Sequence, residues 1–310
     1  MLIATATPIF ASMAKYQTTL QFSLVAALFA LAVYVSLWSG VLSLFPIAAG
    51  AIGGFSYAGL QRNTDTGLVE GLLICGAIGA VVALIASYGL LRLSSHYMAM
   101  ATIATVLISR VIVLNLDSTG GAAGTGLSRN SSIRDLWIVL VLVCWVLSRL
   151  RRSKLGLAVE TVREDAAVAA ALGINTRNVQ RIAFTMSGAI GAMAGVLQAD
   201  LLQYIGPNTY YVDLGFTTLA AVVLGGAYHW LGPVIGALVF AFLPEFLGEF
   251  FEAGETIANG IMLIVIMIYL PRGLVDPARR MPWSRKRATT TDELAVAPVP
   301  SVGATEGGAA

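Results

Sequence analysis

The chain has 310 residues, of which 57% are hydrophobic and 12% are charged, and its mean hydropathy is +0.80. Soluble domains carry about one quarter charged residues, so this composition excludes an ordinary soluble protein and predicts an all-α, polytopic bundle of transmembrane helices. The formal net charge is +2, and the two cysteines and two histidines form neither a C-x-x-C nor an H-E-x-x-H pattern. We therefore expect no disulfide, metal site, cofactor, catalytic residue or nucleic-acid partner.

Apolar stretches set the expected path through the membrane, because a helix that crosses the bilayer needs roughly 20 apolar residues. Nine stretches qualify, so we predict nine spans, within a range of eight to ten. The first is read as a span rather than a removable signal peptide, because only Lys15 precedes it and no small-residue cleavage site follows. Glycines interrupt residues 48–59 and 216–227, so some spans are expected to be short or broken. The nine candidates are residues 20–38, 41–60, 68–91, 97–116, 136–150, 182–202, 214–227, 231–251 and 256–270.

Positive charges orient this path, because Lys and Arg accumulate on the cytoplasmic side of a membrane protein. Of the 19 Lys and Arg residues, seven lie in residues 149–181 and six follow residue 271. Four predicted spans separate these two segments, so both are expected to face the cytoplasm. Nine spans would place the N-terminus outside, and ten would place it inside.

Two regions follow from this pattern. Residues 1–287 form the predicted transmembrane domain, with a cytoplasmic loop at residues 149–181. Residues 288–310 are rich in Ala, Thr, Gly, Pro and Val and lack aromatic residues, so they are predicted to be a disordered cytoplasmic tail.

A charged, alanine-rich segment, "GLAVETVREDAAVAAALGI" (156–174), lies inside this loop. It lacks proline, so we predict one helix over residues 155–172, bounded by Gly156 and Gly173. Glu160 and Glu164 are expected to project away from its apolar stripe. Such a helix cannot cross the bilayer, and it is either a protein-binding surface or an ordinary solvated connection. The stripe comprises Leu155, Val159, Val162, Ala166, Ala169 and Ala170.

Longer motifs surround this segment. One is "SRLRRSKLGLAVETVREDAAVAAALGIN" (148–175), and the others are "LLRLSSHYMAMATIATVLISRVIVLN" (90–115), "AAVVLGGAYHWLGPVIGALVFAFLPEF" (220–246) and "IYLPRGLVDP" (268–277). Together they closely resemble the LivM-type permease subunits of branched-chain amino acid ABC transporters, over roughly residues 40–277.

This resemblance implies a permease subunit of an importer in a bacterial-type inner (plasma) membrane, which carries branched-chain or other hydrophobic amino acids. It implies that Arg163, Glu164, Asp165 and Gly173 couple the chain to separate ATPase subunits. A second related permease subunit and a periplasmic or extracellular solute-binding protein are the other implied partners. The chain has no G-x-x-x-x-G-K-[ST] phosphate loop, so we do not expect it to hydrolyse ATP itself.

The resemblance has departures that leave the solute open. The chain reads "LSLFPIAAGAIGGF" (42–55), with Pro46 where the family carries a polar residue. Tyr228 and His229 replace residues that are small or polar in relatives. No substrate-contact residue is predicted.

Several polar residues lie in or near the predicted spans, and the cost of placing charge in lipid indicates where each should face. Arg110 is expected to face protein or water, because an intramembrane charge is costly in lipid. Asp200 and Asp213 are expected to be solvated residues at the outer rim. Glu245 lies late in its span, facing the central route or marking the interface, and His229 is expected to anchor the inner interface. The glycine-rich outer loop 117–127 is the expected meeting place for a substrate-delivering protein.

The sequence leaves two other functions to consider. Ser56 in "GFSYA" (54–58) with His229 would suit an intramembrane serine protease, although nothing in the sequence places them together. A carrier driven by an ion gradient would also have broken helices, but it would require carboxylates in mid-membrane.

Overall fold

A computed structural model describes residues 2–64, 66–93, 95–116, 119–226 and 229–247. The chain divides into two units, Met1–Asp276 and Pro277–Ala310. The second unit, the predicted span 256–270 and the predicted tail 288–310 all lie outside the described residues.

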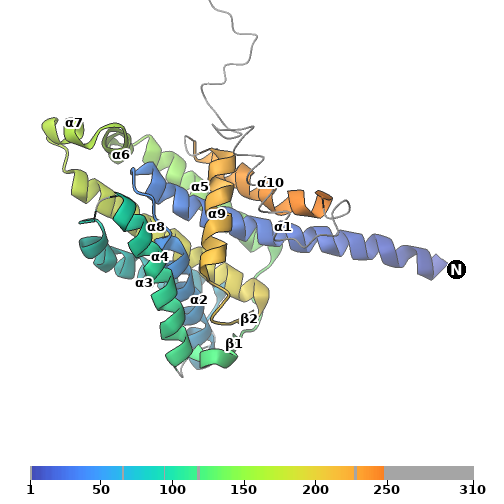
Figure 1. The fold of residues 1–310 in the computed structure, drawn as a ribbon. Helices are drawn as coiled ribbons and strands as arrows, with labels where there is room; N and C mark the ends of the chain where they lie inside the picture. Colours follow the sequence, from blue (N-terminus) through green and yellow to red (C-terminus); the bar gives the residue numbers. More distant parts are fainter. Residues whose placement is uncertain (1, 65, 94, 117–118, 227–228, 248–310) are drawn as a thin grey trace, which may run out of the picture. The chain divides into compact units, whose positions relative to one another are not determined.

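The helices of the first unit follow the predicted spans closely (Figure 1). Eight of the nine predicted spans coincide with helices, which confirms a polytopic helical fold, and the ninth lies outside the described part. Besides the α-helices, the part of the chain that the structure describes contains a short 3-10 helix, η2 (Gly121–Ala123), and two antiparallel strands, β1 (Thr125–Gly126) and β2 (Tyr204–Ile205). The helices are α1 (Leu2–Trp38), α2 (Phe45–Asn63), α3 (Leu68–Leu90), α4 (Ser95–Asn115), α5 (Ile133–Arg151), α6 (Lys154–Glu164), α7 (Ala166–Ala171), α8 (Thr176–Leu202), α9 (Val212–Gly225) and α10 (Leu231–Leu247).

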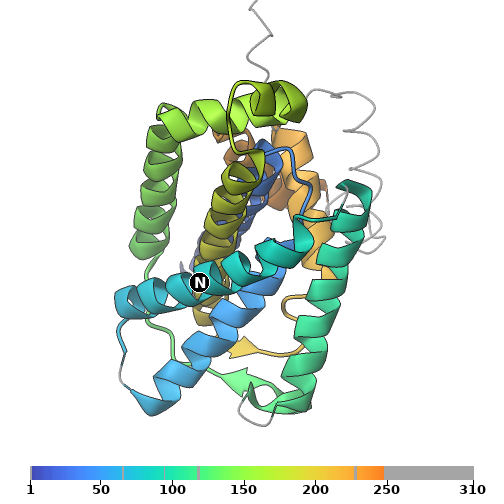
Figure 2. The ribbon, with the colours of Figure 1, turned by 90° about the vertical axis from the view of Figure 1, so that its left-hand side faces the viewer.

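Among the described residues, four segments are long and apolar enough to cross a membrane: Gln17–Trp38, Leu68–Leu90, Tyr97–Asn115 and Thr176–Leu202. Contacts show that α2 and α5 run between the same two ends as α8. The C-terminal end of α2 meets the loop before α5, and α5 then runs to the α6 end of the bundle. Figure 2 shows α6 and α7 at one end of these helices and the two strands at the other. Five helices, α1 to α5, precede α6 in the described part of the chain.

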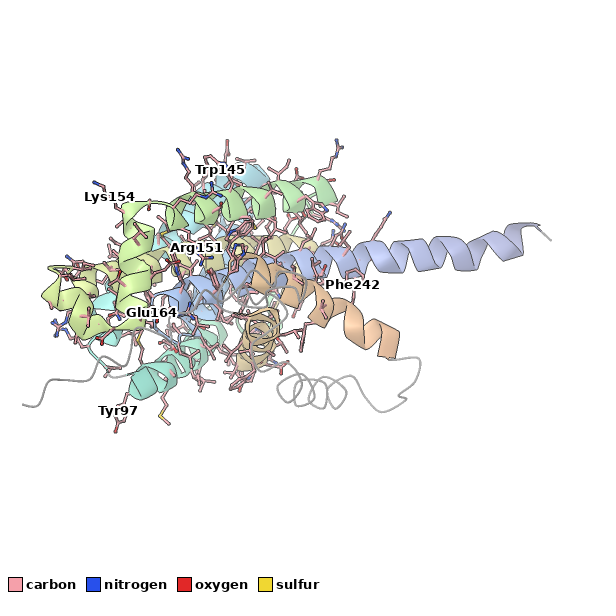
Figure 3. The ribbon with its side chains drawn as sticks, turned by 90° about the horizontal axis from the view of Figure 1, so that it is seen from above. Tyr97, Trp145, Arg151, Lys154, Glu164 and Phe242 are labelled. Carbon is pink, nitrogen blue, oxygen red and sulfur yellow. The ribbon has the colours of Figure 1, made fainter. Side chains whose placement is uncertain are left out.

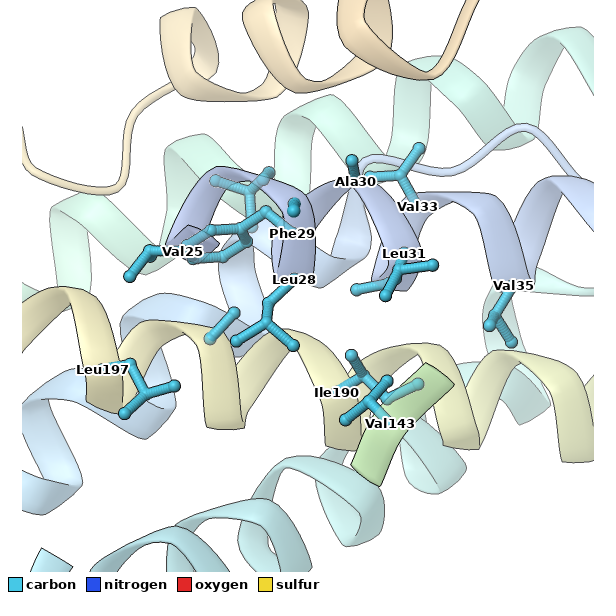
Figure 4. Close-up of a cluster of buried hydrophobic side chains, with 14 of the residues drawn as sticks. Val25, Leu28, Phe29, Ala30, Leu31, Val33, Val35, Val143, Ile190 and Leu197 are labelled. Atoms are coloured by element: carbon cyan, nitrogen blue, oxygen red, sulfur yellow. The ribbon is translucent and has the colours of Figure 1, made fainter. Parts of the chain in front are cut away.

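Helix α1 forms the centre of the described bundle. Residues 27–35 are at most 2% exposed, so this part of the helix is surrounded by protein on all sides. Figure 4 shows Leu28 and Leu31 of α1 beside Ile190 of α8, with Val143 of α5 close by. A helix that is apolar all round is expected in such a buried position.

Glycines four residues apart, a spacing common at the contacts between membrane helices, bring α8 close to its neighbours. A Cβ atom on Gly195 would overlap the backbone carbonyl of Gly50 in α2, and one on Gly191 would overlap Pro46. Similarly, Gly236 of α10 packs directly on the backbone of α9 at Ala221. These small residues therefore serve helix packing.

Candidate functional site

The connection between α5 and α8, residues 154–173, is hereafter the α6–α7 segment. It is not the single helix predicted from its sequence, because it breaks at Asp165. The backbone of Asp165 is extended, with φ −153° and ψ 110°. Its carboxylate accepts hydrogen bonds from the backbone N–H groups of Ala167 at 2.7 Å and Val168 at 3.1 Å. An aspartate that caps a new helix satisfies N–H groups that would otherwise lack partners, which explains the break.

Helix α6 is fixed tightly to the end of α5. The hydroxyl of Ser153 caps α6 by accepting the N–H of Gly156 at 3.4 Å. Gly156 lies against the carbonyl oxygens of Leu150 and Arg151, where a Cβ atom would overlap both. This glycine, predicted to bound the helix, therefore permits the sharp corner between α5 and α6.

Only part of the predicted apolar stripe is buried. Val159 and Val162 of α6 and Ala169 of α7 lie in the core, whereas Leu155 is 43% exposed and Ala166 and Ala170 are also exposed. The prediction of one continuous stripe was wrong, because the break at Asp165 changes the direction of the chain. Helix α6 contacts α1 and α8, so its buried valines attach it to the inner ends of two core helices.

The acidic residues of the segment divide into two groups. Glu160, predicted to project freely, pairs with Arg151 of α5 at 2.9 Å, with both side chains partly exposed. Glu164 and Asp165 are exposed to solvent. Figure 3 shows Lys154 and Glu164 at opposite ends of α6, with Arg151 on the side toward the core. The free acidic charge of the segment is therefore concentrated at the α6–α7 break.

Gly173 ends α7 as predicted. Its φ of +80° lies in the left-handed region, where glycine is favoured, and no atom lies within 4 Å of a Cβ built on it. The N–H of Ile174 bonds the carbonyl of Ala169 at 3.0 Å, which closes the helix end. Asn175 then caps α8.

The structure thus brings Arg163, Glu164 and Asp165 together at the break, with Gly173 one short helix away. Arg163 is half-buried, and its Cα lies 3.5 Å from a Cβ built on Gly40 in the loop after α1. Val168 is 52% exposed and Leu172 is 69% exposed. The exposed surface at the break thus combines two acidic groups with two large apolar side chains.

At the opposite end of the bundle, Asp200 is fully buried, and the prediction of a solvated rim residue was wrong. Its carboxylate accepts the backbone N–H groups of Asn130 at 2.9 Å and Ser131 at 2.8 Å, and the Tyr57 hydroxyl at 3.4 Å. Asp213, in contrast, is exposed as predicted. The sequence feature that could have indicated the burial of Asp200 is its position inside the last turns of α8, before Leu201 and Leu202.

Further contacts tie the outer loop, residues 119–132, to the helix ends. Gln61 of α2 donates to the carbonyl of Ser128 at 3.3 Å, and Arg62 donates to the hydroxyl of Thr125 at 3.2 Å. Strand β1 in this loop pairs with β2, which follows α8. The glycine-rich outer loop is therefore attached to both α2 and α8.

Arg110 faces protein, as predicted. Its Nε donates to the side-chain oxygen of Asn208 at 2.9 Å, and its guanidinium lies 5.1 Å from the centre of the Tyr211 ring. Asn208 lies just before α9 and Tyr211 is its N-cap residue, so Arg110 links α4 to the start of that helix.

His229 lies between α9 and α10, where its Nδ1 accepts the N–H of Leu231 at 3.2 Å and its ring lies 5.5 Å from that of Trp230. Burial lowers the pKa of His229, and the positive charge of Arg151 lowers it further. Its proximity to Arg151 places His229 at the α6 end, as predicted for an interfacial residue. Ser56 lines a cavity among α2, α3 and α4, so the structure does not form a Ser56–His229 dyad. Glu245 belongs to α10, but its side chain lies outside the described part.

That cavity, hereafter the α2–α4 cavity, has a volume of about 530 Å³. In the part of the chain that the structure describes, no cluster of three His, Cys, Asp or Glu side chains is placed to hold a metal ion. Cys75 and Cys144 are free thiols.

Comparisons with known proteins agree with this arrangement. The family model described as "Branched-chain amino acid transport system / permease component" matches residues 15–270. The high-affinity branched-chain amino acid transport system permease protein LivM of Escherichia coli (strain K12) is 28% identical over 265 residues, which cover 74% of this chain and 62% of LivM. No solved structure matches the chain.

Two other relatives match this chain over fewer residues than LivM does. The permease protein LivH of Escherichia coli (strain K12) is 31% identical over 143 residues, covering 45% of this chain and 46% of LivH. The ribose import permease protein RbsC of the same strain is 26% identical over 212 residues, covering 61% of this chain and 62% of RbsC. The chain thus spans about six-tenths of the length of its LivM relatives. Because the family model covers most of the chain, the protein belongs to the family of branched-chain amino acid transport system permease components.

Proposed function

We propose that the chain is the membrane-spanning permease subunit of an ABC importer in a bacterial inner (plasma) membrane. It forms part of the path for branched-chain or other hydrophobic amino acids, and it is not itself an enzyme, because separate ATPase subunits supply the energy. The observation that carries this proposal is the exposed break at Asp165, with Glu164 beside it, on the positively charged side of the bundle. The family match and the relatives LivM and LivH support it.

The attachment of α6 suggests how movement passes through the segment. Val159 and Val162 are buried against the core, and Gly156 allows α6 to meet α5 without a gap. Helix α7 is mostly exposed and joined to α6 by one extended residue. An ATPase that binds α7 and the break would therefore displace α6, and α6 would carry the displacement to α1 and α8.

The remaining partners belong to the same proposal. A second related permease subunit completes the path, and a periplasmic or extracellular binding protein delivers the solute to the outer loop. Residues 288–310 form a cytoplasmic tail beyond the permease domain.

Substitution of Glu164 tests the ATPase contact, because this residue is exposed and is not the helix cap. We expect Glu164→Lys to lower both co-purification of the ATPase subunits and ATP-driven L-leucine uptake at least tenfold in proteoliposomes. The matched control is Glu70→Lys, which changes an exposed acidic residue in the first turn of α3, at the opposite end of the bundle. Unchanged uptake and co-purification in Glu164→Lys would refute the proposed contact.

The ion-gradient carrier is tested in the same vesicles. Uptake that requires ATP and continues after ionophores dissipate the ion gradients supports the importer. Uptake that proceeds without the ATPase subunits and stops with the ionophores favours the carrier instead.

A further inference from the structure

The α2–α4 cavity has an uncharged wall. Its lining consists of apolar side chains with four hydroxyl groups, and it contains no Asp, Glu, Lys, Arg or His. An unpaired charge in such surroundings would be costly, so the cavity does not suit a solute with a charged side chain. Its volume of about 530 Å³ is within the range of sites that hold small molecules.

The cavity follows the helix axes rather than forming a single round pocket. The N–H of Leu44 donates to the hydroxyl of Thr102 at 3.2 Å, which sets the start of α2 level with Thr102 of α4. Lining residues on α2 extend from Phe45 to Gly59. At 1.5 Å per residue this corresponds to about 20 Å, most of the hydrocarbon thickness.

Three of the hydroxyl groups occur at intervals along this length. Measured from the Leu44–Thr102 contact at 1.5 Å per residue, Thr105 lies about 5 Å along the axis, Ser109 about 10 Å and Ser56 about 18 Å. A solute that moves along the cavity would therefore meet a new hydroxyl group about every 5 to 8 Å.

These hydroxyl groups can serve both charged ends of a neutral amino acid. Thr105 donates to the carbonyl of Ala101 and Ser109 donates to that of Val106, so their oxygens remain available as acceptors for an ammonium group. Ser56 has no hydrogen-bond partner among the described residues, so its hydroxyl can donate to a carboxylate. An acyl chain of a lipid would use none of these groups.

We propose that the α2–α4 cavity is the route of the transported solute through this subunit, and that it accepts neutral amino acids with apolar side chains. The apolar wall holds the side chain, while Thr105, Ser109 and Ser56 in turn bind the ammonium and carboxylate groups. This inference rests on the proposed importer function and adds the location of the route.

The first test fills the cavity. Ile112 and Val111 are neighbours on α4 with nearly equal exposure, 55% and 54%, but only Ile112 lines the cavity. In the complete transporter in proteoliposomes, Ile112→Trp should lower ATP-driven L-leucine uptake at least tenfold, whereas Val111→Trp should leave it within twofold of the unsubstituted protein. ATPase co-purification should be unchanged in both. Equal uptake by the two variants would overturn the proposed route.

The second test measures occupancy directly with Ser56→Cys in a background of Cys75→Ala and Cys144→Ala. L-Leucine should protect the new thiol from a small maleimide, and L-lysine should not. Each methylene group added between L-alanine and L-leucine should lower the half-protecting concentration about fourfold, because its burial is favourable by about 0.8 kcal/mol. Val111→Cys provides the control and should show no protection.

The outcomes separate the possible occupants. If L-leucine does not change the labelling of Ser56→Cys but removal of lipid increases it, the cavity holds lipid. If labelling is blocked only in the assembled complex, the cavity holds a helix of a partner subunit. Both results overturn the route. If the unsubstituted transporter shows no ATP-driven L-leucine uptake, the proposed function fails. If the unsubstituted transporter takes up L-leucine and Ile112→Trp does so equally well, the proposed route is refuted and the proposed function stands.

Discussion

The buried carboxylate of Asp200 is expected to hold the outer loop closed, and Asp200→Asn isolates this role with little change in size. The carboxylate accepts two backbone N–H groups, from Asn130 and Ser131, at 2.9 and 2.8 Å. Asparagine can accept one of them, but its amide nitrogen would then face the other donor.

The expected cost follows from these two bonds. A hydrogen bond to a charged group contributes about 1.5 to 3 kcal/mol, and a buried donor without a partner costs about 1 to 3 kcal/mol. Loss of one bond and weakening of the other therefore destabilises the closed loop by about 3 kcal/mol. At 1.4 kcal/mol per factor of ten, the open form becomes about 100-fold more populated.

Hydrogen exchange with mass spectrometry measures this opening directly. Peptides that cover residues 125–132 should exchange about 100-fold faster in Asp200→Asn, while peptides from the α6–α7 segment should not change. Asp213→Asn is the matched control, because Asp213 is an exposed carboxylate near the same end of the bundle. Exchange in residues 125–132 that stays within threefold of the unsubstituted protein would show that Asp200 does not hold the loop.

Three further predictions concern the helix contacts and the inner end. Gly195→Ala should prevent stable folding or lower the melting temperature sharply, because its Cβ would overlap the Gly50 carbonyl. Gly59→Ala is the control and should melt like the unsubstituted protein, because no atom lies within 4 Å of a Cβ at that position. Asp165→Ala should cost about 1 kcal/mol locally and speed hydrogen exchange in residues 166–171, whereas Asp165→Asn, which still caps α7, should exchange as before; equal exchange in both variants would contradict the capping role. The pKa of His229 is lower in the folded chain than its ordinary value of 6.5, so the folded chain takes up this proton at a lower pH than the unfolded chain. The contribution of His229 to stability is therefore present above pH 6.5 and decreases as the pH falls. Melting curves between pH 7.5 and 5.5 should therefore show a smaller decrease in His229→Gln, and an identical decrease would refute this assignment.

Apolar length was sufficient to predict most of the helices, because each span satisfies its backbone hydrogen bonds within itself. The break at Asp165 was missed because alanine-rich sequence on both sides favours helix, and an aspartate can lie within a helix or cap one. The choice depends on whether the chain must turn back along the bundle at that point.

Contacts between distant residues could not be predicted in the same way. Asp200 and Asn130 are 70 residues apart in the chain, so the burial of that carboxylate depends on how α5 and α8 are placed. The α2–α4 cavity likewise depends on the separation of α2, α3 and α4, which hydropathy does not report. In contrast, Gly173 was predicted correctly, because the end of a helix is decided by its own backbone.

The central position of α1 has a consequence for synthesis of the protein. Of the described helices, α1 is made before all the others that enclose it, and its partner α8 begins at Thr176, well over a hundred residues later. Until then α1 must remain in the membrane without this partner, for which its segment Gln17–Trp38, with a mean hydropathy of 2.1, is suited. When α8 arrives, the Ser187 hydroxyl donates to the carbonyl of Ala32 at 2.7 Å, so lipid around α1 is exchanged for protein late in assembly.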